Sequence, residues 1–160
     1  PGEASSELPP RSRKLAVKTY SFVHDVPVEP AVVWEVVSDH PGMVRWTPLR
    51  RVEMEAGGRP QPHGVGAVRA LHLVGPPIRE EITAYEPERR LAYRALSGLP
   101  AKDYTGEIVL EPTARGTRLT WSLRFTPLIP GAQFGIAAGI RFAARSMAKE
   151  ATRRGAEVRP

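Results

Sequence analysis

Between residues 49 and 127 the sequence consists of short segments rich in β-branched and aromatic residues, separated by glycine and proline. Apolar and polar residues alternate within most of these segments, which is the period of a strand with one buried face. Because the connections are short, consecutive strands are expected to pair as an antiparallel meander. Glycines at 64, 66 and 106 fall where a bulge or bend would curve the sheet. The six segments are LRRVEMEAGG, GVGAVRALHLVG, PPIREEITAYEP, ERRLAYRALSG, KDYTGEIVLEP and GTRLTWSLRFTP.

One strand and two short helices are expected before this meander. Residues 15–26 alternate between apolar and polar side chains, which predicts a strand. Pro30 suits the first turn of a helix, and the apolar positions within AVVWEVVSD predict that a short helix follows it. The residues DHPG end this helix, and a second helical turn is expected around 41–46.

After Pro130 the apolar residues recur every three or four positions, which predicts a long amphipathic helix. This helix is expected to run to about Arg154, with Gly155 as its stop signal. Arginine and lysine residues mark a second face of the helix. The predicted apolar face consists of Ile136, Ile140, Ala144, Met147 and Ala151.

The chain is long enough for one domain. It has 160 residues, of which 41% are hydrophobic and 25% charged. We expect residues 1–14 to form a flexible N-terminal arm, 15–155 a single ligand-binding domain and 156–160 a C-terminal tail. The predicted fold class is α+β, with a curved antiparallel sheet of about seven strands wrapped around the C-terminal helix. A sheet bent around one helix leaves a cavity between them.

Three glycines, at 131, 135 and 139, lie in the first part of the predicted helix. Each glycine inside a helix costs about 0.5–1 kcal/mol relative to alanine, so a compensating role is expected. One interpretation is that they widen the cavity and allow close approach of the sheet; the other is a frayed first turn. Dimerisation inside a membrane, which small residues at this spacing also serve, is opposed by the polar face of the helix.

Composition argues against several partners. The chain contains no cysteine, which excludes disulfides and thiolate metal sites and makes the cytoplasm the expected location. Its four histidines lack metal-ligand spacing, so no metal and no cofactor are expected. The longest uncharged run, 126–140, is shorter than the ~20 residues of a transmembrane helix. The net charge of +6 is spread over all segments, which favours solubility over nucleic-acid binding. No pattern predicts an oligomeric state.

The order of elements and four stretches of sequence resemble the START-related helix-grip (SRPBCC) superfamily, in its polyketide cyclase/dehydrase and lipid-transport branch. The resemblance covers roughly 15–153 and implies the helix-grip fold. It does not determine an activity, because the superfamily includes lipid carriers, hormone-binding proteins and aromatic cyclases. The stretches are VPVEPAVVWEVVSDHPGMVRWTP, GVGAVRAL, EEITAYEPERRLAYRAL and GTRLTWSLRF.

Alternation along each strand predicts which residues face the cavity. Arg69 and Glu80 are expected to face inward as near-diagonal neighbours on adjacent strands, where they would form an ion pair. This pair either fixes the strand register or forms the polar end of a ligand cavity. The predicted ligand-binding residues are Trp46, Arg69, Leu71, Glu80, Tyr93, Tyr104, Trp121, Phe125, Ile136 and Ile140.

Evidence for catalysis in the sequence is weak. Nucleophile, phosphate-loop and dinucleotide motifs are absent. Glu80 and His40 are the only candidate proton-transfer residues. His40 is expected with Asp39 and Trp46 at the cavity mouth, where an Asp-His-Pro sequence is more typical of a turn.

Three functions remain open. The first is binding or carriage of a hydrophobic small molecule, such as a lipid, a polyketide or an aromatic metabolite, in the internal cavity. The second is an aromatic cyclase or dehydratase, in which Glu80 or His40 would transfer protons and Arg69 would stabilise an enolate. The third is an interaction protein that docks on a partner or an anionic surface through its arginines, with a filled core and no ligand. The thin catalytic signal favours binding over enzymatic activity.

Overall fold

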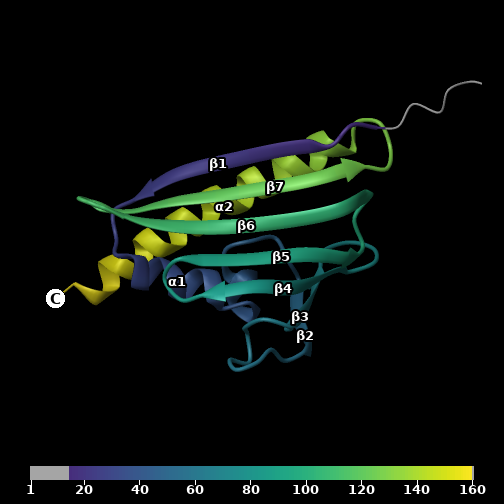
Figure 1. Ribbon diagram of the computed structural model, residues 1–160. Coiled ribbons are helices and arrows are strands. Elements are labelled where there is room, and N and C mark those ends of the chain that lie inside the picture. Colours follow the sequence, from purple (N-terminus) through teal and green to yellow (C-terminus); the bar gives the residue numbers. More distant parts are fainter. Residues whose placement is uncertain (1–14, 160) are drawn as a thin grey trace, which may run out of the picture.

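A single antiparallel sheet and one long helix account for most of the chain, and the computed structural model describes residues 15–159 of it (Figure 1). The predicted flexible arm, 1–14, lies outside the described residues. The elements, in chain order, are β1 (Lys18–Val26), α1 (Pro30–Ser38), the 3-10 helix η1 (Pro41–Arg45), β2 (Arg51–Ala56), β3 (Val68–His72), β4 (Ile78–Glu86), β5 (Arg90–Ser97), β6 (Ala101–Thr113), β7 (Gly116–Pro127) and α2 (Ala132–Val158).

The seven strands lie in the order β1-β7-β6-β5-β4-β3-β2, and all neighbours are antiparallel. The predicted α+β class and the meander from β2 to β7 are therefore confirmed. β1 closes the order by pairing with β7, so the first and last strands of the chain are neighbours (Figure 1). α2 packs on β1 and β7 and touches α1, so the sheet curves around it as expected.

The inward faces of the strands follow the sequence alternation. On β7, Leu119, Trp121, Leu123 and Phe125 are all buried, while the residues between them are more exposed. On β6 the buried set contains Gly106, and a Cβ atom at this position would lie 2.1 Å from the ring of Tyr93 on β5. Gly106 is therefore required by the ring that crosses it.

The two short helices form where the sequence predicted them. Pro30 begins α1, and Val33, Val36 and Val37 are its buried residues together with Trp34. After α1 ends, the side chain of Asp39 accepts a hydrogen bond from the backbone N–H of Gly42 at 3.1 Å. This bond satisfies a donor at the start of η1, which has no intrahelical partner there.

The expected end of the last helix was wrong. α2 continues to Val158, and Gly155 is a buried residue inside it rather than its stop signal. A Cβ atom at Gly155 would lie 2.2 Å from Cγ1 of Val28, so glycine here permits close contact between α2 and the segment before α1. Most of the expected 156–160 tail is consequently helical. Within the described residues, no helix is long and apolar enough to cross a membrane.

Candidate functional site

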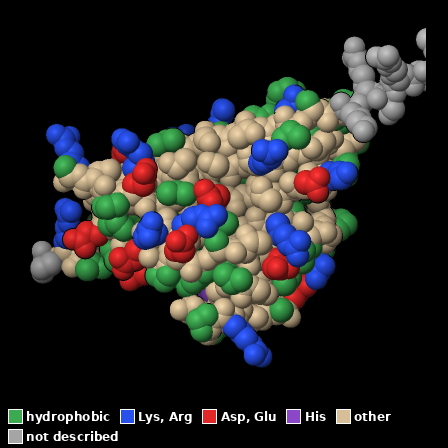
Figure 2. Space-filling view, viewed as in Figure 1, with side chains coloured by type: hydrophobic (Ala, Val, Ile, Leu, Met, Phe, Trp, Pro, Cys, Tyr) green, Lys and Arg blue, Asp and Glu red, His purple; other side chains and the backbone are tan. Residues whose placement is uncertain are grey.

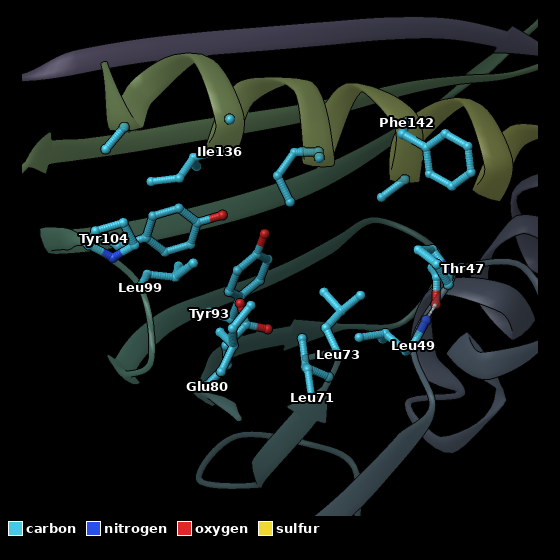
Figure 3. Close-up of a pocket in the computed structure, with 18 of the residues that line it drawn as sticks. Thr47, Leu49, Leu71, Leu73, Glu80, Tyr93, Leu99, Tyr104, Ile136 and Phe142 are labelled. Carbon is cyan, nitrogen blue, oxygen red and sulfur yellow. Dashed lines mark hydrogen bonds between the residues drawn. The ribbon is translucent and has the colours of Figure 1, made fainter. Parts of the chain in front are cut away.

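A cavity of about 680 Å³ lies between the inner face of the sheet and the first half of α2 (Figure 3). Its wall is mainly apolar and is completed by the segment after η1 and by the β5–β6 connection. Three residues that line the cavity are also partly exposed, namely Leu73, Ile129 and Phe142. The cavity therefore opens to solvent between them. The lining residues are Met43, Thr47, Pro48, Leu49, Arg69, Leu71, Leu73, Ile78, Glu80, Tyr93, Leu99, Pro100, Tyr104, Trp121, Ile129, Gly131, Ala132, Gly135, Ile136, Gly139, Ile140, Phe142 and Ala143.

The three glycines singled out in the sequence all line this cavity. A Cβ atom added at Gly131, Gly135 or Gly139 would meet no atom within 4 Å. At Gly135 and Gly139 the missing side chains therefore contribute empty volume. Gly131 lies just before α2 rather than inside it, and its φ of 85° by itself favours glycine. Close approach to the sheet, the other part of that interpretation, is not seen at these positions.

One end of the cavity holds a buried ion pair. Arg69 on β3 and Glu80 on β4 are direct cross-strand partners, not the diagonal neighbours that were expected. The Nε and Nη2 atoms of Arg69 each lie 3.0 Å from Oε1 of Glu80, and both side chains are almost completely buried. Burial raises the pKa of the Glu80 carboxyl, and Arg69 acts in the opposite direction. Neither charge is stable here without the other.

His40 extends this pair away from the cavity. Nη1 of Arg69 lies 3.0 Å from Nδ1 of His40, and Nε2 of His40 lies 3.0 Å from the carbonyl oxygen of His63. Because a guanidinium only donates, Nδ1 of His40 accepts and Nε2 carries the proton. Burial and the charge of Arg69 lower the pKa of His40 to about 3, so the ring is neutral near pH 7.

His40 was expected at the cavity mouth, and this position was wrong. The residue is fully buried and is not part of the wall. The ring of His63, in the β2–β3 connection, lies 4.9 Å from the His40 ring between centroids, and its Nδ1 donates to the carbonyl of Ser38. The two histidines thus link η1 and the β2–β3 connection to the ion pair.

Three aromatic residues adjoin the charged pair. Nε1 of Trp121 donates to the hydroxyl oxygen of Tyr93 at 2.9 Å, and the Arg69 guanidinium lies 5.1 Å from the centre of the Tyr93 ring. Figure 3 shows the hydroxyls of Tyr93 and Tyr104 both directed into the space below α2. Burial raises the pKa of both phenols above the usual range, so they remain protonated hydrogen-bond donors.

Gly106→Ala is expected to disturb this aromatic group. The new methyl would overlap the Tyr93 ring and push it toward the cavity, breaking its bond with Trp121. We expect a loss of about 1–3 kcal/mol in the free energy of unfolding, measured by urea denaturation. Gly139→Ala is the matched control, because it adds the same methyl in open space and should not destabilise the protein. Equal stabilities of the two variants would contradict this placement of Tyr93.

Most of the predicted ligand-binding residues lie on the cavity wall, and two do not. Trp46 is buried away from the cavity. Phe125 faces inward as expected, but its ring packs between Tyr20 and Tyr104, at centroid distances of 6.1 and 5.6 Å. Those on the wall are Arg69, Leu71, Glu80, Tyr93, Tyr104, Trp121, Ile136 and Ile140. Their role in binding stays a prediction.

Several wall residues escaped the sequence reasoning. Ile129 lies in the turn before α2 and Phe142 on the exposed side of α2, where alternation indicates no buried face. Leu73, by contrast, shares the inward alternation of Arg69 and Leu71. No local signal identifies Ile129 and Phe142, because single apolar residues on a surface are common and indicate a site only when they form a patch. Among residues 15–159, no group of three or more His, Cys, Asp or Glu side chains is arranged to hold a metal ion.

Solved structures of low sequence identity share this fold. The ZhuI aromatase/cyclase from Streptomyces sp. R1128 matches with a TM-score of 0.70 and 21% identity, over 87% of this chain and 96% of its own. Ara h 8.0201 matches with a TM-score of 0.70 and 15% identity, over 85% and 98% of the two chains. Norcoclaurine synthase of Thalictrum flavum matches with a TM-score of 0.67 and 14% identity, over 88% and 97%.

The sequence comparisons give one decisive match. No curated protein matches the chain in sequence. The family model described as polyketide cyclase / dehydrase and lipid transport matches residues 18–157, which is nearly the whole described chain. This match and the shared fold confirm the resemblance to the SRPBCC helix-grip superfamily. The chain belongs to the polyketide cyclase/dehydrase and lipid-transport family.

Proposed function

We propose that this protein binds and carries one hydrophobic small molecule, such as a lipid, a polyketide or an aromatic metabolite, in the cavity beneath α2. The observation that supports this most is the cavity itself, whose volume of about 680 Å³ lies in the range typical of small-molecule sites. Its wall is apolar except at one end. Two helix positions that favour alanine on stability grounds, Gly135 and Gly139, are glycines that leave the space open.

The polar end suggests how the ligand is oriented. Arg69 is neutralised by Glu80, so the site has no unpaired charge to attract an ionic group. The neutral phenols of Tyr93 and Tyr104 are directed into the cavity and can donate to a carbonyl or hydroxyl oxygen (Figure 3). We therefore expect an uncharged ligand with an oxygen at one end and an apolar body that extends toward the mouth.

Binding is favoured over turnover by the state of the two candidate proton-transfer residues. The Glu80 carboxylate is held by two nitrogens of Arg69. His40 is off the wall, and its only N–H is donated to a backbone carbonyl. The cyclase alternative is supported by the structural likeness to an aromatase/cyclase and by Arg69 and two phenols at one end of the cavity. The ligand-free alternative has no such support.

Gly139→Leu is expected to block ligand binding without harming the fold. The added side chain enters empty cavity space, and removing a helical glycine stabilises by about 0.5–1 kcal/mol. Titration of the neutral fluorophore N-phenyl-naphthylamine should show at least about tenfold weaker binding than to the wild type. Ala138→Leu is the matched control, because residue 138 is exposed and off the wall. Equal affinity in the wild type and Gly139→Leu would overturn the proposal.

Two measurements separate the three functions. Native mass spectrometry of protein purified from its source should show an added small-molecule mass if it is a carrier, and no added mass if it is a ligand-free interaction protein. Turnover of a supplied poly-β-ketone that is abolished by Glu80→Gln would favour the cyclase, provided that the variant keeps its fold.

A further inference from the structure

Large apolar side chains remain exposed around the cavity mouth, on three separate segments. Leu73 after β3, Ile129 before α2 and Phe142 on α2 are 41%, 56% and 54% exposed although all three line the cavity. Val74, next to Leu73, and Phe134, between the wall residues Ala132 and Gly135, are 83% and 70% exposed. We call these five residues the mouth rim. Exposed apolar residues that gather at one opening mark an interaction site.

Basic residues share the exposed side of α2 with the mouth rim. At 100° per residue, Phe134, Phe142, Arg145 and Lys149 fall within an arc of about 80°. Residues 132–149 contain no Asp or Glu. Neither Arg145 nor Lys149 forms a salt bridge with any residue of the described range. This side of the helix is therefore both apolar and positively charged.

The outer face of the sheet shows the opposite arrangement. There Lys and Arg lie beside Asp and Glu (Figure 2), in cross-strand pairs such as Arg90 with Glu107 and Arg94 with Glu81. These ion pairs compensate part of the positive charge on this face. On α2, by contrast, residues 132–149 offer no carboxylate for such pairs.

We propose that the mouth rim and the basic side of α2 dock on an anionic lipid bilayer, with the cavity opening toward the membrane. Aromatic side chains enter the interface, and long basic side chains extend to the lipid phosphates. α2 is too polar to span the bilayer, so it lies on the surface. An apolar ligand would then pass between bilayer and cavity without crossing water. Docking itself does not depend on the proposed ligand binding.

A second copy of this chain is a poorer occupant of the same surface. A twofold interface centred on the mouth rim would bring Arg145 and Lys149 of both copies close together. Like charges across an interface oppose association. A bilayer that contains acidic lipids supplies the complementary charge instead.

Flotation with vesicles tests the docking. The wild type should bind vesicles of phosphatidylcholine with phosphatidylglycerol at least about tenfold more tightly than vesicles of phosphatidylcholine alone. The double variant Arg145→Gln/Lys149→Gln should lose most of this preference, since each basic residue contributes about fivefold. Phe134→Ser should weaken binding to both vesicle types, because it removes apolar contact. Phe134 is off the cavity wall, so this change leaves the cavity intact.

Control variants decide between the surfaces. Arg94→Gln/Arg118→Gln removes the same charge from the outer face of the sheet and should bind vesicles as the wild type does. If both double variants lost the same amount of vesicle binding, the proposed docking surface would be wrong. Equal binding to vesicles with and without phosphatidylglycerol would also contradict it. A dimer in analytical ultracentrifugation that Phe134→Ser dissociates would assign the surface to a second copy. Gly139→Leu, which fills the cavity, should dock normally, so failure of docking and failure of ligand binding are distinguishable.

Discussion

Arg69→Met is expected to lower the free energy of unfolding by about 3–5 kcal/mol, the usual cost of leaving one member of a buried ion pair alone. The substitution removes both nitrogens that contact Glu80, which is only 4% exposed. It also leaves Nδ1 of His40 without its donor. Urea denaturation at pH 7 measures the loss.

The double variant Arg69→Met/Glu80→Leu distinguishes the cost of leaving one charge unpaired from the net contribution of the ion pair to stability. Replacing both charges by apolar groups removes the desolvation penalty as well as the attraction, so most of the stability should return. Arg79→Met is the matched control, since Arg79 pairs with Glu55 on the surface and should cost less than about 1 kcal/mol. If Arg69→Met cost no more than Arg79→Met, the pair would not have the buried role assigned here.

Lowering the pH from 7 to 5 is expected to cost the wild type about 2 kcal/mol through His40 alone. The pKa of His40 is lowered from 6.5 to about 3 in the folded protein, by burial first and by Arg69 second. Between these two values the unfolded chain binds a proton that the folded chain does not. Stability is therefore complete above pH 6.5 and is lost as the pH falls toward 3.

The variant His40→Gln isolates this contribution. A glutamine carbonyl can accept from Arg69 in place of Nδ1, but it does not titrate. Glu80 acts in the opposite sense in both proteins, because its raised pKa makes the folded state hold a proton more tightly. The difference between the two unfolding curves at pH 7 and pH 5 thus reports His40. Parallel pH dependence in both proteins would show that His40 is not kept neutral by burial.

Much of the cavity wall was accessible from alternation. On each strand, every second residue points to the same face of the sheet. This alternation places Tyr93, Tyr104 and Trp121 on the same side as the apolar residues of their own strands, which is the buried side. Trp46 and Phe125 show the limit of this reasoning. Alternation indicates that a side chain is inside, but it does not indicate whether the side chain reaches a cavity or is covered by another ring.

His40 and Gly155 show a second limit. The environment of each residue depends on a segment distant in sequence. His40 accepts a hydrogen bond from Arg69, and Gly155 packs closely against Val28. Local rules assigned His40 to a turn and Gly155 to a helix end, and both rules are sound for isolated segments. They fail here because tertiary contacts supply hydrogen bonds and close packing that no local pattern contains.

The order of elements, the faces of the strands and the single long helix were determined by the sequence itself, because burial imposes a period of two on strands and about 3.6 on helices. The tertiary structure alone decided that β1 joins β7, that Arg69 lies directly opposite Glu80 and that His40 is buried behind them. The physical reason is that a period depends only on neighbouring residues. The register between two strands depends on the length of the turn that joins them. Whether a side chain such as His40 is buried depends on packing between segments far apart in the chain.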